Sequence, residues 1–189
     1  MVLVIFLLLA VVNAKDLPIP IPQKLEFSYE GSRNCDDFDG KINLENIVLE
    51  QIGENVMALS GDFVLKTEMP ENVIVKVTIS RCPSRAERGI CESIPPQIID
   101  NVCDRLPEKD KEWSGFVEKL EHFVPTCPVQ PGNYHFDEYV VDMSTLASAP
   151  LMEAYWILNS EAFVGKERVM CIFSEIEFKS TNKRKMKLG

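Results

Sequence analysis

A stretch of ten residues, CPVQPGNYHF from Cys127 to Phe136, decides the fold. Two prolines and a glycine within it predict a turn, because proline presets its backbone angle and glycine adopts conformations that other residues avoid. Tyr134, Phe136 and Val140 then recur at roughly every second position, the spacing of a half-buried strand. Turn, strand and anchored cysteine together predict a β fold that is stapled by disulfides.

The apolar run MVLVIFLLLAVVNA at residues 1–14 ends in small residues of the kind that signal peptidase accepts, so we expect a cleaved signal peptide. A buried or membrane helix is the alternative, but the run is shorter than the roughly 20 residues that span a bilayer. Residues 15–24 are rich in proline and predict an extended lead-in. We expect a single domain over residues 25–179 and a flexible basic tail over 180–189.

The formal net charge of the chain is −9, and several of its basic residues lie in the tail. An acidic body argues against nucleic acid as a partner, because nucleic-acid binding needs clustered lysine and arginine. The basic tail could contact an anionic membrane surface transiently, or it could simply be solvated.

Six cysteines follow the signal peptide, an even number that predicts disulfides in a secreted chain. A metal site is the weaker alternative, because no CxxC pair occurs and neither histidine has ligand spacing with the thiols. Six cysteines allow 15 pairings, and their spacing alone does not choose among them. The cysteines are Cys35, Cys82, Cys91, Cys103, Cys127 and Cys171.

Alternation of apolar and polar residues predicts seven strands. The clearest signal is Val73, Val75, Val77 and Ile79, which should face the core while the residues between them face water. A turn is expected after the first strand, at residues 31–34. The expected strands are residues 25–29, 42–50, 58–69, 73–80, 134–141, 152–159 and 168–178.

Prolines interrupt the insertion at residues 83–126, and strand periodicity disappears there. We expect one or two short helices, over residues 98–106 and 109–123. In the second helix Trp113, Phe116 and Leu120 recur on one face, with Val117 and Phe123 beside them.

The last two strands carry apolar residues on both faces and therefore need cover on both sides. In an all-β domain this predicts two sheets that face each other, either packed tightly or held apart around an apolar cavity. The fold class expected is therefore an all-β, two-sheet sandwich or cup.

Catalytic motifs are missing from the sequence: there is no GxSxG elbow, no phosphate-binding loop and no HExxH helix. His135 and Asp137 should share one strand face, but no nucleophile accompanies them, so an ordinary polar face is the better interpretation. Asp36, Asp37 and Asp39 lack the spacing of a calcium loop and predict a solvated turn. We expect no enzymatic activity, no cofactor and no metal.

Apolar residues also occur where loops are expected. Met143, Leu146, Leu151 and Met152 flank the small-residue segment STLASAP, and Trp113 lies in the proline-broken insertion. These side chains are either a lid folded onto the core or a hydrophobic mouth that admits a lipid.

Three motifs in order resemble the ML lipid-recognition family: NCDD after the first strand, CPVQPGNYHF, and VMCIFSEIEF near the end. The ganglioside-activator branch, with its related insect secreted proteins, is the most similar, and the likeness spans roughly residues 27–179. It implies an immunoglobulin-like β-cup around an apolar cavity. It also implies three disulfides: Cys35 with Cys171, Cys82 with Cys91, and Cys103 with Cys127. The activator's additional bridge has no counterpart, because residues 122–126 contain no cysteine.

The resemblance further implies a secreted or lysosomal, non-enzymatic protein that binds and transfers lipids or other hydrophobic molecules. The protein partner that it implies is a receptor or a hydrolase. The alternative is an extracellular chemosensory or signalling accessory protein that binds a pheromone-like ligand or a receptor. The residues expected at the mouth or in the cavity are Trp113, Phe116, Val117, Leu120, Phe123, Leu146, Leu151, Met152 and Trp156.

Overall fold

The structure is a computed structural model that describes residues 25–36, 38–111, 113–143 and 153–180. The expected signal peptide, the lead-in and the tail beyond Ser180 lie outside the described residues. The last strand ends at Ser180, two residues beyond its expected end at Phe178.

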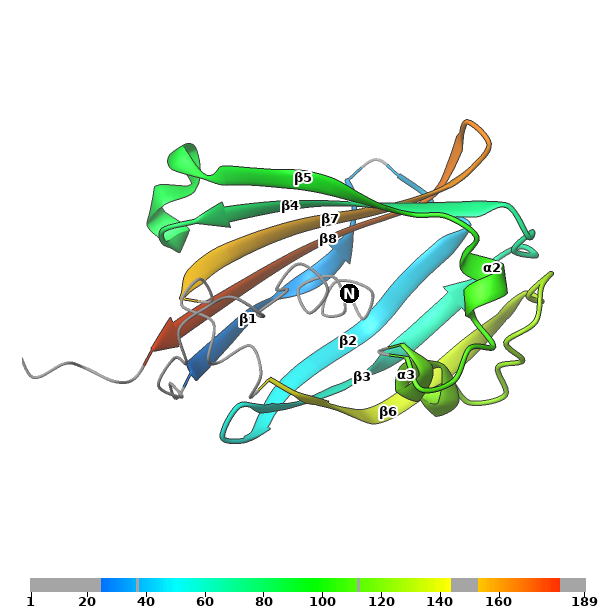
Figure 1. Ribbon diagram of the computed structural model, residues 1–189, viewed down its shortest axis with the longest axis horizontal. Helices are drawn as coiled ribbons and strands as arrows, with labels where there is room; N and C mark the ends of the chain where they lie inside the picture. The colour runs from blue at the N-terminus through cyan, green and yellow to red at the C-terminus, as the bar shows by residue number, and fades with distance from the viewer. Residues whose placement is uncertain (1–24, 37, 112, 144–152, 181–189) are drawn as a thin grey trace, which may run out of the picture.

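Eight strands of the described residues form two antiparallel sheets, which confirms the all-β, two-sheet sandwich (Figure 1). The five-stranded sheet has the order β1-β8-β7-β4-β5, and the three-stranded sheet has the order β2-β3-β6. The strands are β1 (Leu25–Asn34), β2 (Ile42–Gly53), β3 (Val56–Leu65), β4 (Val73–Cys82), β5 (Glu92–Ile99), β6 (Gly132–Asp142), β7 (Ala154–Val164) and β8 (Glu167–Ser180).

The inner face of β4 confirms the clearest sequence signal. Val73, Val75, Val77 and Ile79 are all buried, and Ile74 on the opposite face is exposed. Paired residues of antiparallel strands point to the same side, so Leu158 of β7, opposite Ile79, also faces the three-stranded sheet. Both sheets contribute to one apolar core between them.

The expectation for Val140 was wrong, because β6 contains a β-bulge. Leu59 of β3 pairs with Tyr139 and Gly61 pairs with Phe136, so one extra residue lies on β6 between these pairs. Glu138 is one of the two residues between these pairs on β6, and its backbone adopts a positive φ of 46°. The bulge reverses the alternation beyond it, so Val140 points outward and is 52% exposed.

The first strand also continues through its expected turn. Residues 31–34 pair with β8 after a register shift between Tyr29 and Gly31. β1 therefore ends at Asn34, immediately before Cys35, which bonds to Cys171 of β8.

A strand that the sequence analysis missed, β5, pairs with the edge of β4. The register shift lies between the pairs Val77–Gln97 and Ile79–Ile94, so Pro95 and Pro96 fall within a bulge. Proline is tolerated at bulges and on edge strands, where its missing N–H breaks no ladder. Ile98 therefore belongs to this strand, and the first expected helix shortens to α2 (Val102–Arg105).

The second expected helix is also shorter, α3 (Ser114–Lys119). Asp110 and His122 have φ values of 59° and 58°, which interrupt the helical conformation on both sides. Leu120 is already extended, with a ψ of 113°, so the helix ends before it. The rest of this segment is irregular, as its prolines and Gly115 favour.

The three disulfides implied by the resemblance are present, and none of the six cysteines is free. The first joins β1 to β8. The second, Cys82–Cys91, closes the turn that contains η2 (Arg85–Ile90). The third, Cys103–Cys127, ties α2 to the segment that precedes β6.

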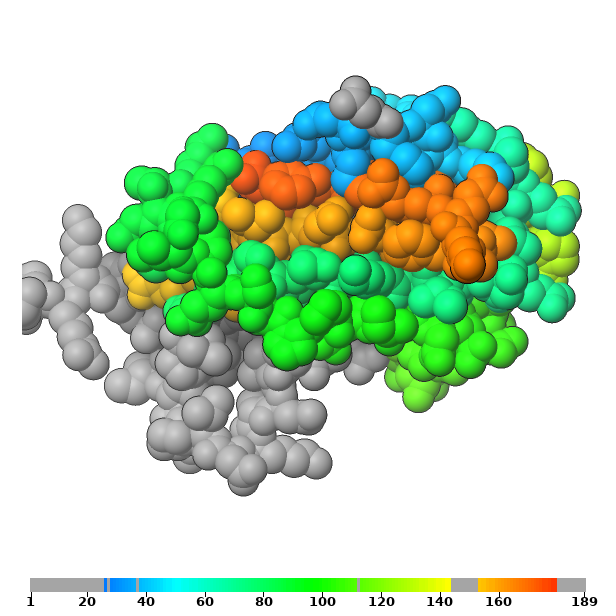
Figure 2. Space-filling view, turned by 90° about the horizontal axis from the view of Figure 1, so that it is seen from above, coloured from blue at the N-terminus to red at the C-terminus, as the bar shows by residue number. Residues whose placement is uncertain are grey.

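The 3-10 helix η2 covers part of the outer face of the five-stranded sheet. Cover on this face was expected, because the last two strands carry apolar residues on both faces. Figure 2 looks onto this face, with η2 at one end and the β7–β8 hairpin at the other. Arg88 of η2 lies 4.9 Å from the ring centroid of Tyr155, whose side chain is fully buried. The Tyr155 hydroxyl donates a hydrogen bond to Glu175 at 2.7 Å. Burial, followed by this contact with Glu175, raises the Tyr155 pKa to about 12.

Candidate ligand-binding interior

The two sheets lie face to face, and one segment lies along one open side between them. β1 and β2 contact each other along one side. On the other side β5 and β6 belong to different sheets, and α2 and α3 lie between them (Figure 1). We call residues 100–131 the cover segment. Its connection to the sheets includes two backbone hydrogen bonds between Met69 and Val129, at 2.9 and 3.1 Å, and one from the Glu121 N–H to the His135 carbonyl at 2.8 Å.

An aromatic cluster joins the cover segment to the inner face of the three-stranded sheet. Phe116 of α3 contacts Phe136 and Tyr139 edge-on, with ring centroids 5.0 and 5.7 Å apart. Phe123 contacts Tyr134 in the same manner at 5.0 Å. Such edge-to-face pairs add about 0.5–1.5 kcal/mol beyond the burial of their surface. Three predicted site residues, Phe116, Leu120 and Phe123, therefore do lie on the interior.

Local hydrogen bonds fix the turn that leads into α3. The Ser114 hydroxyl donates to the Glu108 carbonyl at 2.8 Å and accepts from the Lys111 N–H at 2.9 Å. The Trp113 indole N–H donates to the Arg105 carbonyl at 2.8 Å, which links α3 to α2. Trp113 is half-buried and packs against the core, while Leu120 is buried.

The other predicted site residues are not all gathered at the cover segment. Val117 is half-buried on α3. Trp156 is buried on the inner face of β7, in the five-stranded sheet. Leu146, Leu151 and Met152 lie outside the described residues. Met143, just before them, is buried in the core.

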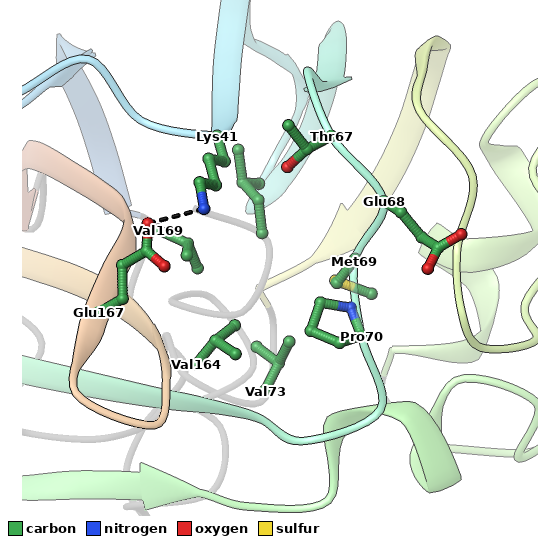
Figure 3. Close-up of a pocket in the computed structure, with 10 residues that line it drawn as sticks. Lys41, Thr67, Glu68, Met69, Pro70, Val73, Val164, Glu167 and Val169 are labelled. Carbon is green, nitrogen blue, oxygen red and sulfur yellow. Dashed lines mark ion pairs between the residues drawn. The ribbon is translucent and has the colours of Figure 1, made fainter.

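A pocket opens at the end of the sandwich that carries the β7–β8 hairpin, and its volume is about 170 Å³ (Figure 3). Its walls come from both sheets and from the β3–β4 loop. The apolar lining residues are Ile42, Met69, Pro70, Val73, Val164 and Val169, and the polar ones are Lys41, Thr67, Glu68 and Glu167. Of these lining residues only Val73 was predicted from the sequence to face the core, and the residues expected to line a cavity are different ones.

An ion pair crosses the mouth of this pocket. Lys41, just before β2, lies 2.7 Å from the carboxylate of Glu167, the first residue of β8. Both side chains are about half exposed, so water screens the pair and its contribution to stability is small. Nothing in the sequence pairs Lys41 with Glu167, because only the packing of the two sheets brings them together.

The outer face of the three-stranded sheet carries His135, as expected for a polar strand face. His135 Nδ1 lies 3.0 Å from Asp62, which also accepts a hydrogen bond from Asn46 at 2.6 Å. The hydrogen bond with Asp62 raises the His135 pKa, and that from Asn46, followed by the His135 contact, lowers the Asp62 pKa.

Asp137, on the same face, binds a different residue, because Ser60 donates to it at 2.7 Å. The Ser60 hydroxyl also accepts from the Glu138 N–H at 3.0 Å, so it is engaged with the bulge. Ser60 and His135 therefore do not form a nucleophile and base pair with each other. Among the described residues, no group of three or more histidine, cysteine or acidic side chains could hold a metal ion.

No protein-family model matches this chain, and no curated protein matches it either. In the part of the chain that the structure describes, no helix has the length and apolar character needed to cross a bilayer.

Proposed function

We propose that the protein is a secreted, non-enzymatic carrier that holds a lipid or a similar hydrophobic molecule between its two sheets. The observation that carries the proposal is how the cover segment packs against the two sheets. Among the described residues no strand pairing joins the sheets on the β5–β6 side, and the cover segment lies there and contributes half-buried aromatic side chains to the interior.

The cover segment is the part of the wall that a ligand can displace. Its regular structure amounts to the six residues of α3 and the four of α2. Segments with short elements and half-buried side chains open locally at a lower free energy than a sheet does. The apolar tail of a ligand would then replace Phe116 and Phe123 against the aromatic face of β6, and would bury a comparable area from water.

Two further observations fit this function, and the second argues against an enzyme. Three disulfides fit an oxidising compartment, as the proposed secretion requires. The polar groups on the outer face of the three-stranded sheet are paired with one another, and Ser60 and His135 are not arranged for nucleophilic chemistry.

The test is transfer of a fluorescent phospholipid between vesicles by delipidated protein, with Trp113→Ala as the variant and Trp113→Phe as its matched control. We expect the wild type to accelerate transfer. Trp113→Ala should slow it, because the cover segment loses the apolar contact of Trp113 with the core, whereas Trp113→Phe retains most of that contact.

Thermal unfolding of the same delipidated samples distinguishes a cover from a core residue. A fully buried tryptophan costs about 3–5 kcal/mol when it is replaced by alanine, and we expect a smaller loss for half-buried Trp113. The proposal is wrong if the wild type neither binds nor transfers fatty acids, phospholipids or sphingolipids. Unchanged transfer by Trp113→Ala, together with a large fall in the melting temperature, would make Trp113 a plain core residue.

A further inference from the structure

The pocket at the hairpin end of the sandwich is separate from the aromatic cluster beneath the cover segment. None of the described residues that line the pocket belongs to that cluster. Its floor is aliphatic: Ile42, Met69, Val73 and Val169 are each at most 6% exposed. These side chains come from β2, the β3–β4 loop, β4 and β8, so the walls are held by both sheets.

The volume of the pocket excludes a whole lipid. Sites for drug-sized ligands measure about 300–1,000 Å³, whereas an apolar cavity of about 150 Å³ binds benzene. At about 170 Å³, the pocket matches a single small ring or a branched chain of similar size. An aliphatic lining suits such a ring, because it offers close contact and no competing hydrogen bonds.

The mouth of the pocket determines which polar group the ligand carries. Lys41 and Glu167 point toward each other across it, whereas Glu68 points away (Figure 3). Glu68 instead accepts a hydrogen bond from Gln130 at 3.4 Å. The mouth therefore presents one ammonium and one carboxylate that already neutralise each other. A charged ligand would have to separate this pair, but a hydroxyl can donate to the carboxylate and accept from the ammonium without separating it.

We propose that this pocket is a second binding site, which takes a small, neutral, hydroxyl-bearing ring compound such as a simple phenol. The ring lies on Val73, Val164 and Val169, and the hydroxyl bridges Lys41 and Glu167. This site is independent of the lipid carried between the sheets.

The experiment is a methyl NMR titration of the full protein with p-cresol, with toluene and p-toluate as comparison probes. We expect saturable shifts of the Val73, Val164 and Val169 methyl signals with p-cresol. Toluene should bind about five- to tenfold more weakly, because it lacks the hydrogen bond. p-Toluate should also bind more weakly than p-cresol, because its carboxylate competes with Glu167 for Lys41.

Two variants locate the site. Val164→Phe fills the pocket from a half-buried position and should abolish the p-cresol shifts while leaving phospholipid transfer unchanged. Lys41→Met should remove the preference for p-cresol over toluene. Lys66→Met is its matched control, because Lys66 pairs with Asp39 and does not line the pocket.

The proposal is overturned if p-cresol leaves the three methyl signals unchanged up to its solubility limit, or if toluene or p-toluate binds as tightly as p-cresol. Persistence of the shifts in Val164→Phe would also overturn it. Failure of phospholipid transfer with intact p-cresol binding would instead refute only the carrier function.

Discussion

The ring of Phe116 stands edge-on to the ring of Phe136, with the two centroids 5.0 Å apart and the ring planes at 76°. Phe136 is fully buried in β6, whereas Phe116 is half-buried on α3. This pair is thus one of the contacts at which the cover segment meets the core, and its two members should respond differently to truncation.

Phe116→Ala should lower the free energy of unfolding by about 2 kcal/mol, and Phe136→Ala by about 3–5 kcal/mol, because only Phe136 leaves a fully enclosed cavity. For a domain of this size, the first change lowers the melting temperature by about 4–8 °C. The double variant should show a coupling of about 0.5–1.5 kcal/mol. Urea unfolding of the wild type, the two single variants and the double variant measures these differences in the free energy of unfolding. Equal costs for the two single variants would mean that the cover segment is core.

Gly61→Ala should destabilise the protein by about 2–4 kcal/mol, through backbone strain and a close contact. Gly61 has a φ of 156°, and an added Cβ would lie 2.5 Å from Ile47 Cδ1 and 3.1 Å from the Glu45 carbonyl. Gly89→Ala is the control, because nothing lies within 4 Å of its added Cβ. Denaturant midpoints compare the two, and an equal, small effect would show that β2 can move away from Gly61.

The His135–Asp62 pair predicts a pH dependence with a defined sign. The His135 pKa is raised from 6.5, so its contribution to stability is complete below pH 6.5 and disappears as the pH rises through the raised value. The Asp62 pKa is lowered from 3.8, so its contribution is complete above pH 3.8 and disappears as the pH falls through the lowered value. The stability difference between wild type and His135→Gln should therefore be largest between these limits.

An NMR titration of the His135 ring tests the same contact directly. Asp62→Asn removes the carboxylate and should return the His135 pKa toward its ordinary value. Asp137→Asn is the matched control, because Asp137 affects the same ring only through its charge, as the smallest cause. If Asp137→Asn has the larger effect, the hydrogen bond with Asp62 is not what raises the pKa.

The sequence predicted those elements in which local pattern and tertiary environment agree. β4 alternates without interruption, so Val73, Val75, Val77 and Ile79 could be assigned to the core directly. β5 was not predicted, because Pro95 and Pro96 normally interrupt a strand. They are tolerated here because they lie in a bulge of an edge strand, and that position depends on the pairing with β4. Val140 was misplaced for a similar reason, since the reversal at Glu138 is not encoded by the period of the apolar residues.

The site was predictable only in part. The helical spacing of Phe116, Leu120 and Phe123 identified side chains that do face the interior, although the helix itself covers only residues 114–119. Leu120 and Phe123 reach the core from an extended turn beyond the helix. The hairpin-end pocket could not be predicted from the sequence, because its walls come from β2, the β3–β4 loop, β4, β7 and β8.

The disulfide Cys103–Cys127 should control how readily the cover segment opens, because it closes that segment on itself. On the chain-entropy model its loop, with a sequence separation of 24, contributes about 3.5 kcal/mol. The Cys82–Cys91 loop, with a separation of 9, contributes about 2.7 kcal/mol and lies outside the cover segment. Replacing each pair by serines should therefore reduce stability by similar amounts, but only Cys103→Ser with Cys127→Ser should accelerate release of a bound fluorescent lipid. Release rates that change equally in the two double variants would show that global stability, and not the cover segment, governs exchange.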